Sequence, residues 1–280
     1  MGPMRIGFHL PIAKGFDQTL RRAHALGCEV VQIFVKNPRS WGKKAWSDKD
    51  REAFGRLSAA VPVVAHLSYL PNLARSDEDG MSLSGFLHEA ELCKEVGIEN
   101  MVVHCGSRED IARGIDGVAR GVSAALTRFP LDVLLENSAG QGKAIGKNVD
   151  ELVRIYRTIG DCERVGFCLD TAHLFEAGYD VRRRPVWRSI AAELEERCGP
   201  ACIKFFHLND SKTPMASAID RHWHIGKGAI GLGCFRYLVN EKKLAHLGGV
   251  METPKMGNMD ERNMKVMRSL LSPLVSRPFS

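Results

Sequence analysis

Eight short apolar runs, separated by more polar stretches, recur along the chain. In order they read MRIGF, VVQIFV, VPVVA, MVV, DVLL, VGFCL, CIKFF and LGGVM. Short apolar runs bounded by polar residues or turns are typical of buried strands. Their starts lie roughly 30 to 45 residues apart, which is about the length of one strand, one helix and the loops between them.

Amphipathic segments with helical periodicity lie between most of these runs. They are FDQTLRRAHAL, LSGFLHEAELCKEV, DIARGIDGVARGVSAALTRF, VDELVRIYRTI and VWRSIAAELEER. Strands that alternate with helices predict a parallel sheet, and eight such units predict a closed α/β fold, the (β/α)8 TIM barrel. A doubly wound open sheet is the alternative, but no GxGxxG motif follows the first run to favour it.

The length of the chain allows either two small domains or one large one, since α/β barrels often reach this length as a single unit. The chain has 280 residues, of which 44% are hydrophobic, and we predict a single domain over residues 1–280. Residues 1–3 are interpreted as an extension before a natural start at Met4. No window approaches the roughly eighteen apolar residues of a membrane span, so no membrane partner is expected.

The cysteines and the net charge change this picture little. The eight cysteines contain no CxxC pair, and we interpret them as reduced cytoplasmic thiols that mostly fill the core: Cys28, Cys93, Cys105, Cys162, Cys168, Cys198, Cys202 and Cys234. Lysine and arginine outnumber aspartate and glutamate by 39 to 33, a formal charge of +6. That excess suits a polyanionic partner without requiring one.

Side chains that can bind metal follow seven of the eight runs. They are His9, His66, His104, Glu136, Asp170, His207 and Glu252. The C-terminal ends of barrel strands open on one face, so these side chains should share one small volume. A lone histidine after a strand is more often structural than a ligand, but seven convergent cases favour a metal site.

Two further motifs supply ligands to the same face. DTAH places His173 three residues after Asp170, and DRH places Asp220 and His222 two residues apart, on one side of an extended segment. The dense stretch from Phe206 to Gly231 is then the loop after the seventh strand, and its GKGAIG end gives the backbone freedom to turn back.

Without His9, these positions give nine candidate ligands, namely His66, His104, Glu136, Asp170, His173, His207, Asp220, His222 and Glu252. Imidazole and carboxylate donors without cysteine suit zinc, manganese or iron. A mononuclear site uses about four ligands, so nine predict two or three ions with a bridging carboxylate. Multi-metal sites typically handle phosphate esters, and the basic charge then favours a nucleic acid. A sugar-phosphate isomerase is the competing barrel chemistry.

Several of these motifs resemble a known family. LLENSAGQG, CLDTAHLFEAGYD, FHLNDSK and DRHWHIGKGAIG resemble the signatures of the endonuclease IV family of apurinic/apyrimidinic endonucleases. VAHLSYLPNL, VVHCGS and METP fall where that family has its remaining ligands, and KNPRSW resembles its DNA-contacting loop. The resemblance runs in unbroken order from about Ile6 to Glu252. Cys105, Ala172 and Ser138 depart from the family's usual residues, but none of them removes a ligand.

The resemblance implies an activity and a metal content. The chain would be a hydrolase of the deoxyribonuclease IV type that cleaves duplex DNA on the 5′ side of an abasic site, in base excision DNA repair, leaving a 3′-hydroxyl and a 5′-deoxyribose phosphate. The resemblance implies three Zn²⁺ ions per chain, with Mn²⁺ or Fe²⁺ as an alternative at one position. It also implies a cytoplasmic monomer without an obligate protein partner.

The family's ligand positions carry over residue by residue. The resemblance assigns His66 and His104 to the first zinc, Asp170, His207 and Glu252 to the second, and His173, Asp220 and His222 to the third. Glu136 would bridge the first two ions and would be the catalytic side chain that orients or shares the attacking hydroxide. His9 would lie behind a ligand and would not bind metal itself.

The resemblance also names DNA contacts. Arg39 in KNPRSW resembles a residue that the family inserts beside the lesion, and Tyr69 in HLSYL resembles a second wedge. Asn37 and Trp41 are weaker candidates. The alternative for Arg39 is an ordinary loop arginine, and for Trp41 a core or rim aromatic.

Two alternatives stay open at this point. A metal-dependent sugar isomerase or epimerase shares the barrel, but it needs about four ligands and would have no use for His66, His173, Asp220 and His222 together. A non-catalytic, metal-stabilised DNA-binding module would explain the charge. It would not explain ligands gathered at a barrel mouth, where buried carboxylates are costly.

Overall fold

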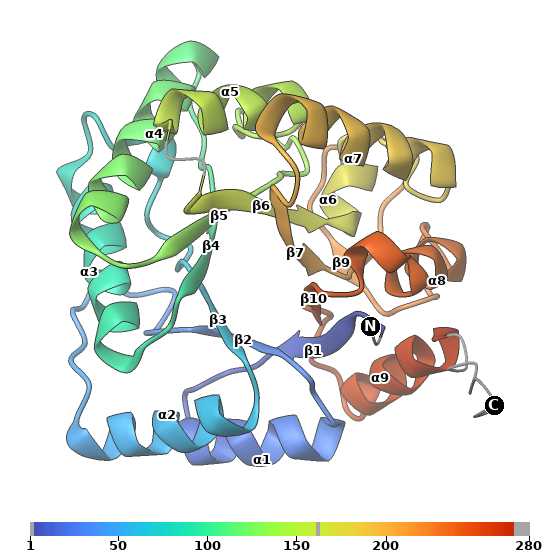
Figure 1. The fold of residues 1–280 in the computed structure, drawn as a ribbon, viewed down its shortest axis with the longest axis horizontal. Coiled ribbons are helices and arrows are strands. Elements are labelled where there is room, and N and C mark those ends of the chain that lie inside the picture. Colours follow the sequence, from blue (N-terminus) through green and yellow to red (C-terminus); the bar gives the residue numbers. More distant parts are fainter. Residues whose placement is uncertain (1–2, 161–162, 272–280) are drawn as a thin grey trace, which may run out of the picture.

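The chain folds as a closed barrel of parallel strands surrounded by helices, in a computed structural model that describes residues 3–160 and 163–271 (Figure 1). The expectation that an extension precedes Met4 rests partly on residues 1–2, and one predicted thiol is Cys162. Both lie outside the described residues. The seven described cysteines form no disulfide. In the described part of the chain, no helix combines the length and the hydrophobicity needed to span a bilayer.

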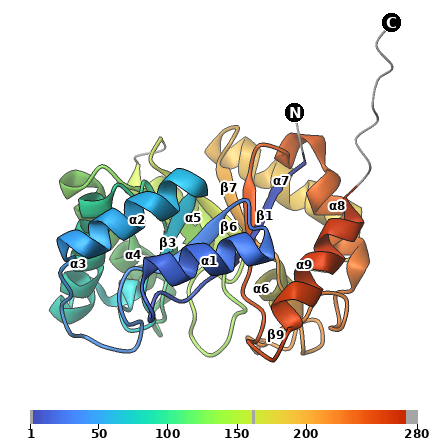
Figure 2. The ribbon, with the colours of Figure 1, turned by 90° about the horizontal axis from the view of Figure 1, so that it is seen from below.

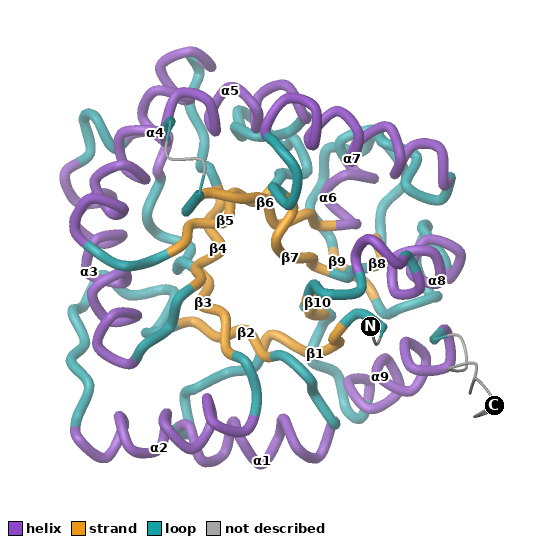
Figure 3. The backbone as a smooth tube through the Cα atoms, in the orientation of Figure 1, coloured by secondary structure: helices purple, strands orange, loops and turns teal. Residues whose placement is uncertain are grey.

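Eight strands form the barrel in sequence order around the ring (Figure 3). They are β1 (Arg5–His9), β2 (Val31–Phe34), β3 (Val63–His66), β4 (Asn100–His104), β5 (Asp132–Glu136), β6 (Val165–Asp170), β7 (Ile203–His207) and β10 (Gly248–Met251). β10 pairs in parallel with β1, with Gly249 opposite Ile6, and so closes the ring. The predicted TIM barrel is confirmed, and the open sheet was the wrong alternative.

Helices cover the outside of the barrel (Figures 1 and 2). They are α1 (Phe16–Leu26), α2 (Asp48–Ala60), α3 (Gly80–Val96), α4 (Ile111–Arg128), α5 (Val149–Ile159), α7 (Arg184–Cys198), α8 (Leu232–Asn240) and α9 (Met259–Leu270). The first and last helices, α1 and α9, lie side by side, which completes the ring (Figure 2). Each predicted amphipathic segment is a helix, and the segments FDQTLRRAHAL and VDELVRIYRTI coincide with α1 and α5.

Smaller elements occur in the loops. The short helix α6 (Thr171–Glu176) follows β6 directly, and β8 (Asp210–Ser211) pairs with β9 (His222–Trp223) as a small hairpin after β7. Single 3₁₀ turns occupy Leu73–Arg75 and Lys242–Leu244. The β8–β9 hairpin is the loop that the sequence predicted after the seventh strand.

Alternation along the strands decides which side chains fill the barrel. An apolar layer inside the barrel consists of Val30, Val64, Val102, Leu134, Cys168, Phe205 and Val250. Two residues after each of them comes the next inward side chain, because strand side chains alternate between the two faces. These side chains form what we call the polar layer: Gln32, His66, His104, Glu136, Asp170, His207 and Glu252. The polar layer therefore lies at the C-terminal mouth of the barrel.

Candidate metal centre at the barrel mouth

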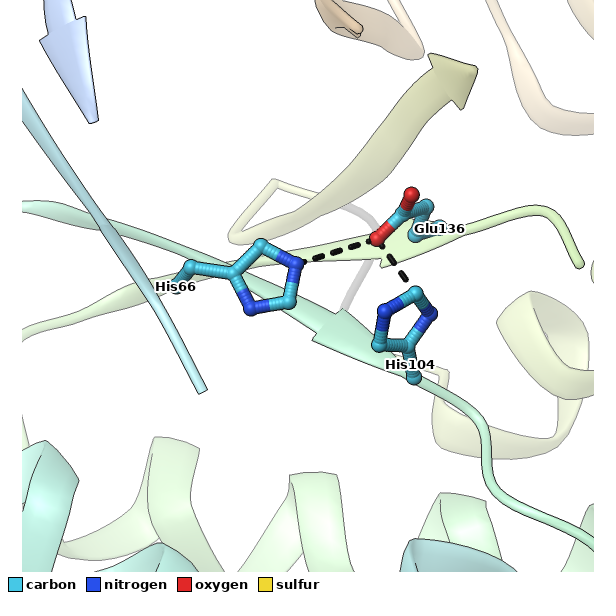
Figure 4. A group of neighbouring side chains, drawn as sticks. All are labelled: His66, His104 and Glu136. Atoms are coloured by element: carbon cyan, nitrogen blue, oxygen red, sulfur yellow. Dashed lines mark hydrogen bonds and ion pairs between the residues drawn. The ribbon is translucent and has the colours of Figure 1, made fainter. Parts of the chain in front are cut away.

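The first group of candidate ligands joins three neighbouring strands. His66 on β3 and His104 on β4 point toward Glu136 on β5 (Figure 4). Glu136 Oε2 lies 3.2 Å from His66 Nε2 and 3.3 Å from His104 Nδ1. His66 Nδ1 donates to the carbonyl oxygen of Leu67 at 2.7 Å, because a carbonyl can only accept. The lone pair of His66 Nε2 is therefore free to bind an ion.

A second group surrounds the other oxygen of Glu136. His207 Nδ1 lies 2.9 Å from Glu136 Oε1, 3.2 Å from Glu252 Oε2 and 3.7 Å from Asp170 Oδ2. One atom from each of these four residues lies within 4.8 Å of the others. The two oxygens of Glu136 thus face different groups, which is the arrangement of a bridging carboxylate.

A third group lies toward the rim. His173 Nε2 and His222 Nε2 are 3.3 Å apart, and Asp220 Oδ1 lies 3.4 Å from the first and 3.6 Å from the second. Asp170 Oδ2 lies 3.4 Å from His222 Nε2, so Asp170 reaches this group as well as the second. The sequence assigned Asp170 to the second group alone. Asp170 reaches both because it ends β6 and also caps α6, with Oδ1 accepting from the His173 N–H at 2.9 Å.

The buried charges of these groups compensate one another. Burial alone would raise the pKa of Glu136, but the charges of His104 and His207 and hydrogen bonds from two imidazoles hold that pKa well below its usual value. Burial alone would lower the pKa of His173, but Asp170 and other carboxylates raise it well above the usual value. Without metal, protonated His173 and His207 thus lie among ionised carboxylates, and a divalent cation could replace their protons.

The donor set fits metal ions of intermediate hardness. Imidazole nitrogens and carboxylate oxygens form four overlapping groups of three or four ligands, and none contains a thiol. Such donors suit zinc, manganese or iron, as the sequence predicted. Glu136, Asp170 and His207 are each 0% exposed, and charged groups so deeply buried are expected to be paired or to bind metal.

Two amides that the sequence analysis missed support the ligands. Asn209 Nδ2 donates to Asp170 Oδ2 at 2.7 Å, and Asn209 Oδ1 accepts from the backbone N–H of Glu252 at 2.7 Å. Gln32 occupies the position that β2 contributes to the polar layer, and its only signal in the sequence is a polar residue within the run VVQIFV. His9, for which the sequence predicts a supporting role, has Nδ1 2.9 Å from Oε1 of the candidate ligand Glu252.

A cavity of about 1010 Å³ opens above the groups. Its lining includes Asn37, Arg39 and Tyr69, three of the four predicted DNA contacts. Tyr69 is 59% exposed and stacks edge-on against Phe34, with ring centroids 5.0 Å apart. Cationic side chains also line the cavity, namely Lys36, Lys44, Arg221 and Lys255. The cavity therefore joins the candidate ligands to a basic surface.

Trp41 is the predicted contact that does not line this cavity. It is 41% exposed, and its ring packs on α3, where a Cβ built on Gly85 would come within 3.0 Å of the indole. Trp41 therefore fits the rim aromatic that the sequence analysis left open.

A buried ion pair joins the loops that carry Arg39 and Tyr69. Lys36 Nζ donates to the backbone oxygen of Ser40 and lies 3.9 Å from Glu89 Oε1. Glu89 accepts from both the hydroxyl and the backbone N–H of Ser68, the latter at 3.0 Å. The backbone N–H of Tyr69 donates to the Pro38 oxygen at 3.2 Å. These contacts hold the two loops in one arrangement above the three groups of candidate ligands.

Asp210 on β8 anchors the GKGAIG segment. Its Oδ2 accepts from the N–H groups of Gly226 and Gly228 at 2.9 and 3.1 Å, and its Oδ1 accepts from Ile230 at 3.0 Å. Asp210 Oδ1 also accepts from the Ser211 N–H at 2.9 Å. These bonds return the chain to the barrel after the hairpin that presents His222.

Comparison with known proteins places these features in a family. Residues 20–271 match the family described as xylose isomerase-like TIM barrel. The chain is 38% identical over 279 residues to a probable endonuclease 4 of Chloroflexus aggregans, with 95% of this chain and 98% of the relative covered. The crystal structure of endonuclease IV from Thermus thermophilus superposes with a TM-score of 0.82 at 35% identity, covering 95% of this chain and 98% of that one. A D-tagatose 3-epimerase-like protein, at 16% identity with 95% and 97% covered, shares the fold with a TM-score of 0.72.

Proposed function

Because this chain belongs to the endonuclease IV family, we propose that it cleaves duplex DNA on the 5′ side of abasic sites, with three zinc ions held by the three ligand groups. A DNA-cleaving hydrolase of the endonuclease IV type, with a place in DNA repair, follows from the family itself. The imidazole and carboxylate donors at the barrel mouth support the proposed zinc-dependent hydrolysis. The sugar epimerase alternative has only the shared fold in its favour.

The observation that carries the proposal is the position of Glu136 between two ligand groups. Its Oε2 faces His66 and His104, and its Oε1 faces His207. Bound divalent cations would supply Lewis acidity to a phosphate and a lowered pKa to water. Glu136 would hold two of them at a fixed separation and accept a hydrogen bond from the attacking water.

Other side chains of this chain would bind and orient the substrate. Exposed cations that line the cavity, such as Arg221 and Lys255, would attract the DNA backbone. Arg39 and Tyr69 stand on two fixed loops above the groups and would fill the gap beside a displaced abasic nucleotide. A stacked base opposes such displacement, so selectivity would come from the ease of deforming damaged DNA. A monomeric state, a cytoplasmic location and the absence of an obligate protein partner stay predictions.

The test uses duplex DNA with one abasic site. We expect a single incision that leaves a 3′-hydroxyl, persists without magnesium and disappears after prolonged treatment with a strong chelator. Readdition of zinc should restore it. Elemental analysis of the active protein should find close to three zinc ions per chain, and full activity in protein that contains no transition metal would rule the proposal out. The control is an undamaged duplex of the same sequence, which should stay intact.

A further inference from the structure

Gln32 is a fully buried amide among the proposed ligands, and no step proposed so far uses it. It is 0% exposed and belongs to the polar layer, whose other members are imidazoles and carboxylates. An amide buried inside an apolar strand costs free energy unless its polar atoms are paired. Its partners therefore indicate what the side chain does.

The two ends of the Gln32 amide face different partners. Its Nε2 lies 2.8 Å from Glu252 Oε1, and its Oε1 lies 2.9 Å from His207 Nε2. A carboxylate can only accept, so the amide nitrogen must face Glu252 and the amide oxygen must face His207. The reverse orientation would set two oxygens against each other.

An oxygen beside His207 Nε2 determines how His207 can bind an ion. The amide oxygen of Gln32 carries no proton, so His207 Nε2 must carry one and donate it. The lone pair of the neutral imidazole is then on Nδ1, which lies 2.9 Å from Glu136 Oε1 and 3.2 Å from Glu252 Oε2. This nitrogen faces the second group.

Gln32 also divides the two oxygens of Glu252 between different tasks. Oε1 accepts from Gln32 and lies 2.9 Å from His9 Nδ1, and neither Gln32 nor His9 is a proposed ligand. Oε2 faces His207 Nδ1. One amide thus directs two ligands toward the same ion.

We propose that Gln32 is a positioning residue of the second group, which selects Nδ1 of His207 and Oε2 of Glu252 as the atoms that face the ion. The inference rests on the proposed metal binding and adds a residue that is not itself a ligand. Within the described residues, its side-chain hydrogen bonds reach only His207, Glu252 and His9. Its effect should therefore be confined to one of the three ions.

The experiment compares the wild-type protein with Gln32→Met, which keeps the side-chain volume and removes the amide. Both proteins are loaded with zinc, and release of zinc to a chromophoric chelator is followed under native conditions. Groups behind metal ligands typically change metal affinity by about 10- to 100-fold, so we expect one ion of the variant to leave faster by about that factor. The other ions should leave at wild-type rates.

Thr19→Val is the matched control. It removes a partly buried hydrogen bond, from the Thr19 hydroxyl to the Pro11 oxygen at 2.9 Å, without touching the ligand groups, and should leave zinc release unchanged. Wild-type release from a folded Gln32→Met protein would overturn the role of Gln32. Wild-type protein that retains no zinc would overturn the proposed function instead, so the two failures are distinguishable.

A measurement on the wild-type protein keeps the inference testable if circular dichroism shows that Gln32→Met does not fold. Nitrogen-15 NMR of the zinc-loaded protein reports which imidazole nitrogen of His207 is protonated. The expected result is a proton on Nε2 and a metal-shifted Nδ1. A proton on Nδ1 would overturn the proposal, because Gln32 could not then have selected that atom.

Discussion

Glu136 is the single residue on which the proposed chemistry most depends. Glu136→Gln replaces one of its two oxygens with an amide nitrogen, which cannot bind a cation, so one of the two facing groups loses a ligand. We expect single-turnover incision of abasic DNA to fall by about a thousandfold or more. DNA binding should survive, because binding depends mainly on backbone contacts. Incision assays and gel-shift titrations measure the two quantities separately.

Glu109→Gln is the control for this change. Glu109 is an exposed carboxylate that pairs with Lys143 at 3.1 Å, so its substitution should leave incision near the wild-type rate. Near-normal incision by a fully metallated Glu136→Gln protein would remove Glu136 from the mechanism.

Asp210 tests whether the hairpin loop depends on one buried carboxylate. In Asp210→Asn, an amide N–H₂ would face backbone N–H groups that now donate to oxygen, such as those of Gly226 and Gly228. Unsatisfied buried donors cost about 1–3 kcal/mol each, so we expect the free energy of unfolding to fall by about 2–4 kcal/mol. Urea unfolding measures this loss, and limited proteolysis should cut within residues 212–230.

Asp180→Asn provides the comparison for Asp210→Asn. Asp180 pairs with Arg182 at the surface, at 2.6 Å, and an exposed pair contributes at most about 1 kcal/mol. Equal losses in the two variants would mean that Asp210 does not anchor the loop.

At the scale of elements, the strands were predictable because each apolar run ends in a polar side chain that points to the same face as the apolar side chain two residues before it. In β5, Leu134 joins the apolar layer and Glu136 the polar layer, so a single run ends in an inward carboxylate. The same spacing recurs from Val64 to His66. An apolar run followed by a ligand can therefore be recognised without knowledge of the fold.

Other features were not predicted, either because their local pattern is weak or because they depend on tertiary contacts. The helix α2 begins at a capping box formed by Ser47 and Asp50, but its residues are mostly polar and show little periodicity. Asp170 serves two groups only because α6 turns His173 back over the end of β6. The sequence places Gln32 correctly in a strand but does not reveal its contacts with His207 and Glu252, because these partners are more than 170 residues away.

The two loops that carry Arg39 and Tyr69 should affect the deformation of the DNA and not the hydrolysis of the phosphodiester. Neither residue is a proposed ligand, so Arg39→Ala and Tyr69→Ala should keep the zinc content and the fold. The substitutions should make it harder to open a stacked duplex, because the side chain that fills the gap left by a displaced nucleotide stabilises the opened DNA by on the order of a few kcal/mol. We expect slower incision of a fully paired abasic duplex, with partial rescue when the site lies in a bulge.

The substrate comparison is the control for these wedge variants. An equal loss on the paired and the bulged substrate would mean that the residues support the metal site. No loss on either would make Arg39 an ordinary loop arginine, the reading that the sequence left open. Trp41→Ala should weaken packing on α3 near Gly85 and affect the two substrates equally.

At the scale of the whole molecule, the net charge and the barrel mouth point to the same partner. The formal charge of +6 is modest, but several cations line the same cavity as the candidate ligands His66, His104 and His222. The C-terminal ends of all eight barrel strands open on one face. Side chains from every strand end can therefore meet there, and a site with many ligands and a basic rim needs no second domain. The sequence could predict this gathering, but it could not show that Asp170 reaches both the second and the third group.

Metal binding should couple the stability of the whole barrel to pH. Without metal, burial would lower the pKa of His173 and His207. The Asp170 carboxylate and other carboxylates nevertheless raise the pKa of His173, and the hydrogen-bonded Cys168 thiol with the carboxylates of Glu252 and Glu136 raises that of His207, both to well above the usual value. A raised pKa stabilises the metal-free fold below about pH 6.5, and this stabilisation is lost as the pH rises through the folded-state pKa. A bound ion requires the neutral imidazole, so it must displace these protons.

The difference in unfolding free energy between the zinc-loaded and the metal-free protein should therefore widen from pH 6 to pH 8. Each displaced proton contributes about 1.4 kcal/mol per pH unit, for as long as the pH stays below the folded-state pKa of that imidazole. Thermal unfolding at one buffered concentration of free zinc, with and without prior chelation, measures the difference. If His173 and His207 had ordinary pKa values, the difference would stop growing near pH 6.5, because the imidazoles would already be neutral. A difference that is constant above pH 6.5 would therefore contradict the protonated state of His173 and His207 in the metal-free protein, whereas growth to pH 8 is expected if zinc displaces their protons at the barrel mouth.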